Sequence, residues 1–427
     1  MKIISLKVKN FKSFQYININ PSEFNVLIGA NASGKSNFTK IFSFLNDIAK
    51  YGLNNAISMQ GGIEYLLNFN MPRSDGLYMQ INYAFKDDVF ISFTLEENDE
   101  LLQEFIMEPQ EVIYEFLVVF DEENEAPKVK KDRISMKCMF FHTQKKGRER
   151  KKRKGEEIGS GNIQLYRSGN KLKSRMDLPE GIKIENDELY PAQLLKQELE
   201  NDQMIINHPV SGFFLLPVIN PFVNIPIYNF DINLQKKAAQ ISGKKELEED
   251  GSNLAIVLKN IIEDEAERRK FITYIKELLP FVERMEVEKF ADKSLLFGLR
   301  EIYNQDIYIP SSLISDGTIN VTGLIIALFF EHKRIIIIEE PERNLHPSLI
   351  SRLIYLMKES SVEKQVFITT HNPETIKHVD REDIFLISRN ESGYSTIMKP
   401  IKSKAVSAFL KNEVGMEELY INNMLGD

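Results

Sequence analysis

Hydrophobic residues along the chain follow the spacing of strands in some segments and the spacing of helices in others. Lys2–Val8 alternates as a half-buried strand does, and Phe24–Ile28 predicts a second short strand that ends in a glycine-bearing loop. Asn37–Lys50 places apolar residues at helical spacing, and Asn253–Glu283 predicts one or two amphipathic helices. The pattern therefore indicates a protein that mixes both element types.

The last quarter of the chain alternates helix and strand. We expect helices at Thr322–Phe330 and Ser348–Glu359, and strands at Arg334–Ile338, Gln365–Thr369 and Ile384–Ile387. Such alternation indicates an α/β fold whose mainly parallel sheet is flanked by helices. Strand-like Leu77–Leu95, with a turn at Lys86–Asp88, predicts an antiparallel β lobe near the N-terminus. The proline-studded middle of the chain indicates a large, mixed, partly helical insertion.

Composition narrows the class of protein. Hydrophobic residues make up 43% and charged residues 27% of the chain, as in globular proteins. No apolar run approaches the roughly 18–20 residues of a membrane helix, and the N-terminus lacks the apolar block of a signal peptide. A single cysteine, Cys138, excludes a disulfide framework and a multi-cysteine metal site. We therefore expect a cytoplasmic protein with no membrane partner.

One basic segment departs from the acidic balance of the chain. The formal net charge is −8, with 62 acidic against 54 basic residues, yet Lys145–Lys154 consists almost entirely of lysine and arginine. Clustered positive charge displaces counterions from a nucleic-acid backbone, so one interpretation is an arm that contacts DNA. The other interpretation is a solvated loop, and both stay open.

The segment Gly29–Ser36 matches G-x-x-x-x-G-K-[ST] at every fixed position, with a strand before it and a helix after it. Such a loop points backbone N–H groups at phosphate oxygens, and the following helix directs its positive end at the same anion. Lys35 is expected to reach the β- and γ-phosphates, and the Ser36 hydroxyl to bind Mg²⁺. The predicted nucleotide-binding residues of this loop are Gly29, Ala30, Asn31, Ala32, Ser33, Gly34, Lys35, Ser36 and Asn37.

Two adjacent acids end the apolar strand Arg334–Ile338. A continuous apolar run is typical of the centre of a parallel sheet, and ligands of such sheets bind at the carboxyl ends of strands. Glu339 is therefore predicted to hold Mg²⁺, and Glu340 to act as the base that polarises the attacking water. The alternative is a charged strand end that faces solvent.

Together with Leu313–Thr318, these motifs resemble the ABC-type ATPases of the SMC, RecF and OLD group within the AAA-family ATPases. In that group a Ser-x-Gly signature on one subunit caps the γ-phosphate held by the phosphate loop of the other. The resemblance assigns this role to Ser315 and Gly317, and it implies a head-to-tail homodimer, or a higher oligomer, around ATP. A simple helix N-cap at Ser315 is the alternative.

The same resemblance gives roles to residues beyond the signature. His371, which ends the predicted strand Gln365–Thr369, looks like the switch histidine of the group and joins Glu340 and Lys35 as a predicted catalytic residue. A structural histidine is the alternative. Asn344–Pro347 falls where the group carries its D-loop, although His346 equally suits a turn.

Near the N-terminus, Lys12 lies in a turn that the group uses close to its nucleotide. A Q-loop glutamine is also expected, and Gln60, Gln80 and Gln144 remain open. Two features depart from the common pattern of the group. Glu339 stands where many relatives have aspartate, and the signature reads ISDGT instead of LSGGQ.

The resemblance implies an Mg²⁺-dependent ATPase, closest in character to stand-alone phage-defence ATPases of the RloA/AbiL-like, Septu or PARIS type. Asp250–Leu254 and Glu418–Tyr420 resemble the RloA/AbiL-like type among these. Residues 372–427 are expected to be too few for the nuclease domain of OLD proteins, so a separate effector protein is expected. The alternative function is a RecF-like DNA-repair ATPase. The long separation of Ser36 from Ser315 argues against a transporter ATPase.

The expected organisation has four parts, of which the first and third form the ATPase head. They are an N-terminal half at 1–120, an insertion domain at 121–300, a C-terminal half at 301–395, and a tail at 396–427.

Overall fold

The computed structural model describes residues 1–85, 90–97, 100–121, 126–144, 153–182, 198–208, 222, 224–290, 293–400 and 416–421. The chain divides into two compact units. The first unit comprises Met1–Pro21, Ser36–Ile225 and Arg389–Thr396, and the second comprises Ser22–Lys35, Pro226–Ser388 and Ile397–Asp427. The phosphate loop thus groups with the C-terminal motifs, and the four predicted segments stay a prediction.

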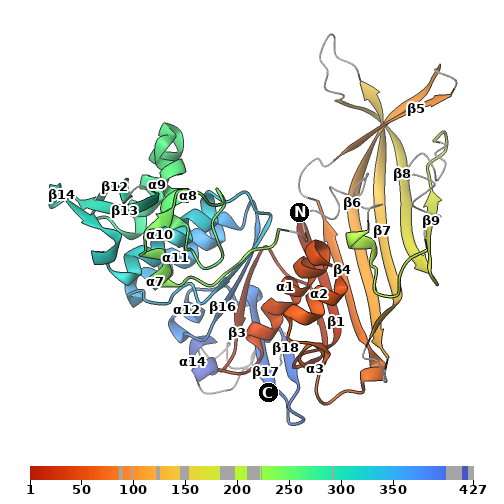
Figure 1. The fold of residues 1–427 in the computed structure, drawn as a ribbon, viewed down its shortest axis with the longest axis horizontal. Helices are drawn as coiled ribbons and strands as arrows, with labels where there is room; N and C mark the ends of the chain where they lie inside the picture. The colour runs from red at the N-terminus through yellow and green to blue at the C-terminus, as the bar shows by residue number, and fades with distance from the viewer. Residues whose placement is uncertain are drawn as a thin grey trace. The chain divides into compact units, whose positions relative to one another are not determined.

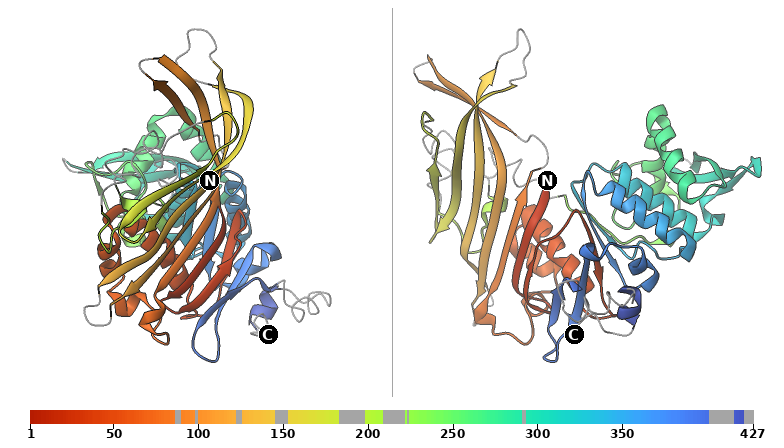
Figure 2. Two further views of the ribbon diagram at one scale, coloured as in Figure 1. Left: turned by 90° about the vertical axis from the view of Figure 1, so that its right-hand side faces the viewer. Right: turned by 180° about the vertical axis from the view of Figure 1, so that it is seen from behind.

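The first unit is built on antiparallel strands in the order β2-β1-β4-β6-β7-β8-β9, with β5 beside β6. The strands are β1 (Lys2–Phe11), β2 (Phe14–Ile19), β4 (Leu77–Ala84), β5 (Ile91–Glu97), β6 (Glu100–Phe120), β7 (Pro127–Gln144), β8 (Arg153–Ser168) and β9 (Lys171–Asp177). The views in Figures 1 and 2 agree that β6 to β9 follow one another side by side, from orange to yellow. A strand β18 (Ser395–Met398) pairs with β2 through Ser395.

Helices that accompany these strands include α1 (Lys35–Tyr51), α2 (Leu53–Met59) and α3 (Ile63–Leu66). Helix α1 buries Phe38, Phe42 and Phe44, and the Phe44 ring contacts Phe11 of β1 at a centroid distance of 5.9 Å. The predicted helix at Asn37–Lys50 is thereby confirmed with slightly longer ends. Short 3-10 turns occur at η1 (Arg73–Asp75) and η2 (Ile205–Asn207).

The second unit contains parallel strands in the order β10-β15-β16-β3-β17. They are β10 (Ile227–Tyr228), β15 (Ile335–Glu339), β16 (Gln365–Thr370), β3 (Phe24–Ile28) and β17 (Ile384–Arg389). All six residues of β16 and all five of β3 are buried, as expected for strands covered on both faces. The predicted α/β fold with a mainly parallel sheet is confirmed.

Helices and a small antiparallel sheet complete the second unit. The helices are α7 (Ile232–Gln235), α8 (Leu254–Glu263), α9 (Glu265–Leu278), α10 (Asp316–Phe329), α11 (Pro347–Ser360), α12 (Pro373–Lys377) and α14 (Met416–Ile421). The small sheet contains β11 (Ala239–Gln240), β12 (Val282–Phe290), β13 (Ser294–Glu301) and β14 (Asn304–Pro310), and it lies beside α8 and α9 in Figure 1. Two 3-10 turns, η4 (Ser311–Leu313) and η5 (Arg381–Asp383), belong to the same unit.

The predicted basic segment falls mostly outside the described residues, since 145–152 are not among them. Lys154, at its end, lies in β8 and forms an ion pair with Glu108 of β6 at 2.6 Å. The turn predicted at Lys86–Asp88 also lies outside the described residues. Among the helices that the structure describes, none is long and apolar enough to cross a membrane.

Candidate active site

The parallel register of the second unit brings three strand ends to one edge. Glu339 of β15 pairs with Thr369 of β16, and Thr370 pairs with Ile28 of β3. The phosphate loop begins directly after Ile28, and His371 follows directly after Thr370. The predicted phosphate loop, acidic pair and histidine therefore meet at the carboxyl edge of one sheet, where parallel sheets bind ligands.

The backbone of the phosphate loop is shaped by a close approach and two left-handed residues. A Cβ at Gly29 would lie 2.3 Å from the Ile387 carbonyl oxygen, so only glycine fits there. Ala32 and Gly34 have φ of 61° and 122°. Lys35 donates to the carbonyl oxygens of Gly29 at 2.6 Å and Ala30 at 3.0 Å. The resulting narrow turn before α1 fits an anion at a helix N-terminus.

The surroundings of the Lys35 ammonium shift its pKa in opposite directions. Burial lowers the pKa of Lys35, and the carboxylates of Glu340 and Glu342 oppose that shift. These electrostatic interactions join the phosphate loop to the loop after β15. The ammonium is held by carbonyl oxygens that a phosphate oxygen can replace as acceptor.

Glu340 has a strained backbone conformation. Its φ of 47° lies in the left-handed region, which costs a non-glycine residue about 1–3 kcal/mol. Its backbone N–H donates to the Thr369 carbonyl at 2.9 Å, which keeps the residue on the edge of β16. Backbone strain of this kind is concentrated at functional sites.

Both carboxylate oxygens of Glu340 are hydrogen bonded. Oε1 lies 2.7 Å from His371 Nδ1, and Oε2 accepts from Arg343 Nη2 at 2.9 Å. Burial pushes the pKa of Glu340 upward, but the bonds and charges of Arg343 and His371 outweigh burial and lower it. The predicted base is therefore an oriented, ionised carboxylate.

The neighbouring Glu339 has a different hydrogen-bond partner. Its Oε2 accepts a hydrogen bond from Asn229 Nδ2 at 3.2 Å. Carboxylate and hydroxyl oxygens are the ligands that Mg²⁺ prefers, so each of these two side chain types, in Glu339 and in Ser36, suits a magnesium ion, and a site that they share stays a prediction. Ser36 lies in the first turn of α1, directly after Lys35.

The predicted signature residues begin α10. Ser315 is the N-cap of this helix, because its Oγ accepts from the Thr318 N–H at 3.3 Å and lies 2.8 Å from Thr318 Oγ1. A Cβ at Gly317 would lie 2.8 Å from the Asn344 carbonyl oxygen, so a glycine lets α10 approach the loop after β15. The N-cap alternative is confirmed, and the γ-phosphate role of Ser315 and Gly317 stays a prediction.

Helix α11 explains part of the predicted D-loop. His346 is its N-cap, and the Ser348 N–H donates to His346 Nδ1 at 3.3 Å. Asn344 has a φ of 64° in the turn before it. His346 thus has a structural role as an N-cap next to a turn, and the D-loop role of Asn344–Pro347 stays a prediction.

Lys12 lies in the first unit, in a pocket of about 330 Å³. Its lining includes Lys12, Ser13, Asn37, Lys40, Gln60, Tyr65 and Arg389. Lys12 donates to the Tyr65 carbonyl at 3.0 Å, and burial together with the charge of Lys40 lowers its pKa to about 8. Of the three open glutamines, Gln60 shares this pocket with Lys12 and Asn37, whereas Gln80 accepts from the Tyr78 hydroxyl on β4. The side chain of Gln144 lies outside the described residues.

Residues 24–377 match the family model described as "AAA domain, putative AbiEii toxin, Type IV TA system". This match covers well over half of the chain. The protein belongs to this AAA family. The predicted resemblance to AAA-family ATPases is confirmed at that level, and nucleotide binding and ATPase chemistry come with it.

Individual similar proteins match very different shares of the chain. A stretch of 56 residues, 13% of the chain, is 43% identical to Endonuclease GajA of Bacillus cereus (strain VD045), of which it spans 10%. A solved SMC head bound to the C-winged helix domain of ScpA aligns with 93% of this chain and 98% of that chain, at 15% identity and a TM-score of 0.47. The SMC head domain from Thermotoga maritima covers 93% of this chain and 99% of its own, at 14% identity and a TM-score of 0.44.

The structure also adds residues to this AAA-family site that the sequence analysis missed. Glu342 is 7% exposed, burial raises its pKa, and the Thr370 hydroxyl donates to it. Its place two residues after Glu340 was a usable signal, which an interpretation limited to an acidic pair overlooked. Tyr420 of α14 approaches the Gly29 backbone within hydrogen-bond reach, and burial raises its pKa. Asn229 and Arg343, which contact the acidic pair, were missed as well.

Proposed function

We propose that this chain is an Mg²⁺-dependent ATPase that dimerises head to tail around ATP and acts as a sensor or scaffold for a separate effector in bacterial anti-phage defence. One observation carries the ATPase part of the proposal. Lys35, Glu340 and His371 come from three different segments and meet at one sheet edge, with Glu340 hydrogen bonded to His371 at 2.7 Å. The similarity of a short stretch to Endonuclease GajA supports the defence part.

In this proposal the chain's own groups prepare the phosphate chain for attack. Backbone N–H groups of Gly29–Lys35 and the N-terminus of α1 bind the phosphates, and Lys35 exchanges the Gly29 and Ala30 carbonyls for phosphate oxygens. Ser36 and Glu339 would hold Mg²⁺, which neutralises phosphate charge when bound. Glu340 accepts the proton of the attacking water, and His371 holds the Glu340 carboxylate in place.

The signature supplies the reason for a dimer. The described hydrogen bonds of Ser315 stay within the first turn of α10, and its hydroxyl lies at a helix N-terminus suited to an anion. We assign Ser315 and Gly317 to the γ-phosphate bound by a second copy of the chain. The site is then complete only in the closed dimer, so turnover is expected to be slow and switch-like.

Replacing Glu340 by Gln tests the proposal. E340Q removes the proton acceptor but keeps a hydrogen-bonding group of the same size, so ATP is expected to stay bound and intact. Size-exclusion chromatography with ATP and Mg²⁺ should show a dimer for E340Q, and the same sample without nucleotide should show a monomer. Hydrolysis by E340Q at the wild-type rate would overturn the assignment of the base. Absence of any nucleotide-dependent dimer would overturn the assembly.

A further inference from the structure

Arg343 lies in the loop after β15 and has no part in the proposed phosphate chemistry. The backbone of this loop is fixed, because the Arg343 N–H donates to the Glu340 carbonyl at 3.0 Å. Asn320 of α10 donates to the Arg343 carbonyl at 2.7 Å and to the Pro341 carbonyl at 3.0 Å. Asn320 is only 4% exposed, so this brace is part of the core. The loop therefore presents the Arg343 side chain from a rigid base.

The Arg343 guanidinium connects the two acids of the site. Its Nη2 donates to Glu340 Oε2 at 2.9 Å, and its Nη1 donates to Asn229 Oδ1 at 3.4 Å. The amide of Asn229 in turn donates to Glu339 Oε2 at 3.2 Å. The carboxylates of consecutive residues are thus joined through the side chains of Arg343 and Asn229, which lie 114 residues apart along the chain.

Asn229 is itself held by neighbouring backbone. It follows β10, where Tyr228 pairs with Ile338 of β15. Its N–H donates to the Glu249 carbonyl at 2.9 Å, and the Ile227 N–H donates to the Glu249 carboxylate at 3.0 Å. The side chain of Asn229 thus starts from a fixed position beside β15.

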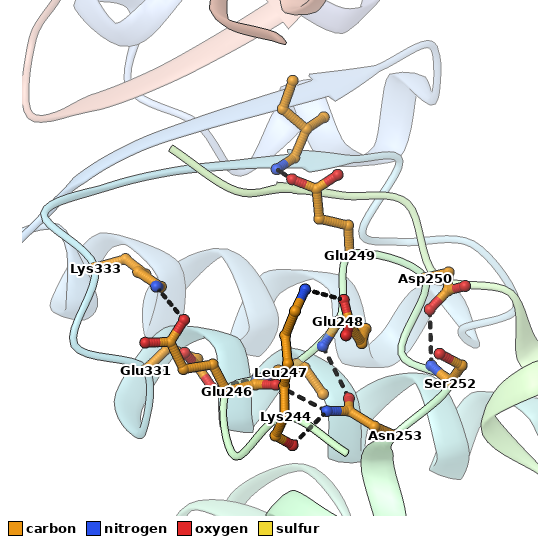
Figure 3. Close-up of polar contacts among 11 residues, drawn as sticks. Lys244, Glu246, Leu247, Glu248, Glu249, Asp250, Ser252, Asn253, Glu331 and Lys333 are labelled. Carbon is orange, nitrogen blue, oxygen red and sulfur yellow. Dashed lines mark hydrogen bonds and ion pairs between the residues drawn. The ribbon is translucent and has the colours of Figure 1, made fainter. Parts of the chain in front are cut away.

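The acidic loop Lys244–Asn253, which carries Glu249, is braced in turn (Figure 3). Glu246 forms an ion pair with Lys333 at 2.6 Å, and the Leu247 N–H donates to the Glu331 carboxylate at 2.7 Å. The Asn253 amide donates to two carbonyls of the same loop, at 2.8 and 3.1 Å. The loop therefore holds Glu249 in place, and the Glu249 carbonyl in turn holds the backbone of Asn229.

We propose that Arg343 and Asn229 are positioning residues of the ATPase site. Arg343 orients Glu340 for the attacking water, and Asn229 orients Glu339 as a ligand of Mg²⁺. The inference rests on the proposed function. Two adjacent anions repel each other, and a donor on each carboxylate fixes its direction. Outer hydrogen-bond partners of this kind typically change metal affinity or activity 10–100-fold when they are removed.

The proposal predicts separate defects for the two residues. R343A is expected to lower kcat for ATP about tenfold with little change in KM, because the phosphate loop is intact. R343K is expected to recover part of kcat, since an ammonium can still donate to Glu340. N229A is expected to raise about tenfold the Mg²⁺ concentration that half-saturates the fluorescence change of bound methylanthraniloyl-ATP, a binding readout that needs no hydrolysis.

Matched controls separate positioning from general damage. R284A removes a surface arginine that pairs with Glu286 at 2.8 Å, and N233A removes an exposed asparagine near Asn229. Both are expected to behave as wild type in kcat, KM and Mg²⁺ dependence. Thermal melting identifies any variant that fails to fold. If R343A does not fold, R343M, which keeps the length of the side chain but has no donor, takes its place, and a kcat equal to that of R284A overturns the role of Arg343.

Each result bears on the proposal. R343A at the R284A rate, or a defect in KM alone, overturns the role of Arg343, and N229A with the Mg²⁺ dependence of N233A overturns that of Asn229. A wild-type protein that neither binds the fluorescent nucleotide nor hydrolyses ATP overturns the proposed function and this inference together. Wild-type activity with unaffected variants overturns the inference alone.

Discussion

The two units use charge in different ways. In the second unit, the interior of β15 is four isoleucines, all buried, and the charged groups Glu339 and Glu340 come only at its end. In the first unit, charged residues lie along the middle of long strands. Glu115 of β6 is 3% exposed and pairs with Lys131 of β7 at 2.8 Å. Charge at a strand end is available for a ligand, whereas charge within a sheet braces its neighbours.

Buried Asp132 of β7 shows the bracing function of the first unit. Its carboxylate accepts a hydrogen bond from the Ile205 N–H at 2.6 Å, which ties the η2 turn to the strand. Arg167 of β8 donates to the Gln203 carbonyl at 2.8 Å in the same region. Substitutions of the charged residues at the strand ends of the second unit are therefore expected to affect nucleotide chemistry, and substitutions of such braces to affect stability.

The largest expected effect comes from Lys35. K35A removes the cation that would face the phosphates, and ATP binding is expected to fall below detection by isothermal titration calorimetry. K50A changes an exposed lysine at the other end of α1 and is expected to bind ATP as wild type does. Retained tight binding by K35A would show that the phosphates lie elsewhere.

Ser315 separates structural and functional roles within the second unit. S315A loses the N-cap of α10, which costs about 1 kcal/mol of stability. S315D keeps a good N-cap but sets a negative charge where the partner's γ-phosphate is expected, so its stability stays near wild type while nucleotide-dependent dimerisation is lost. Chemical denaturation and size exclusion with ATP measure the two quantities. A dimer formed normally by S315D would contradict the signature role.

The contrast between the units also explains how far the sequence could be interpreted. Strands that are continuous apolar runs with a motif at their end can be predicted from the sequence. The predicted strand Phe24–Ile28 is confirmed with the same first and last residues. The long strands β6 and β7 were not predicted, because their alternation is interrupted. Pro109 lies at a register shift between them, and Glu115 is a buried acid whose ion-pair partner Lys131 lies on β7. Local pattern cannot show such pairing.

The residues of the candidate site also differ in whether the sequence predicts them. Motif spacing predicts Lys35, Glu340 and His371, because each lies at the end of a recognisable strand or in a recognisable loop. Asn229 is different, since its contact with Glu339 joins residues 110 positions apart and depends on how β10 aligns with β15. No local signal in Asn229 marks it as part of a site.

The smallest expected effect on function comes from Asp132, where the comparison predicts a change in stability alone. Burial raises the pKa of Asp132 to about 7, although the Ile205 N–H opposes that shift. The ordinary pKa of an aspartate, 3.8, applies in the unfolded chain. Between pH 3.8 and about pH 7 the folded protein therefore binds more protons than the unfolded chain, so its stability falls as the pH rises through this range. The full shift corresponds to at most about 4 kcal/mol at 1.36 kcal/mol per pKa unit.

Replacing Asp132 by Asn removes the ionisation but keeps an oxygen that can accept from Ile205. D132N is expected to melt near the wild-type temperature at pH 4 and several degrees above it at pH 8, with unchanged ATPase activity. D177N, at an exposed position at the end of β9, is expected to follow wild type at both pH values. If D132N instead abolished ATP hydrolysis while remaining folded, the assignment of buried charge in the first unit to bracing would be wrong, because the chemistry would then extend beyond the strand ends of the second unit.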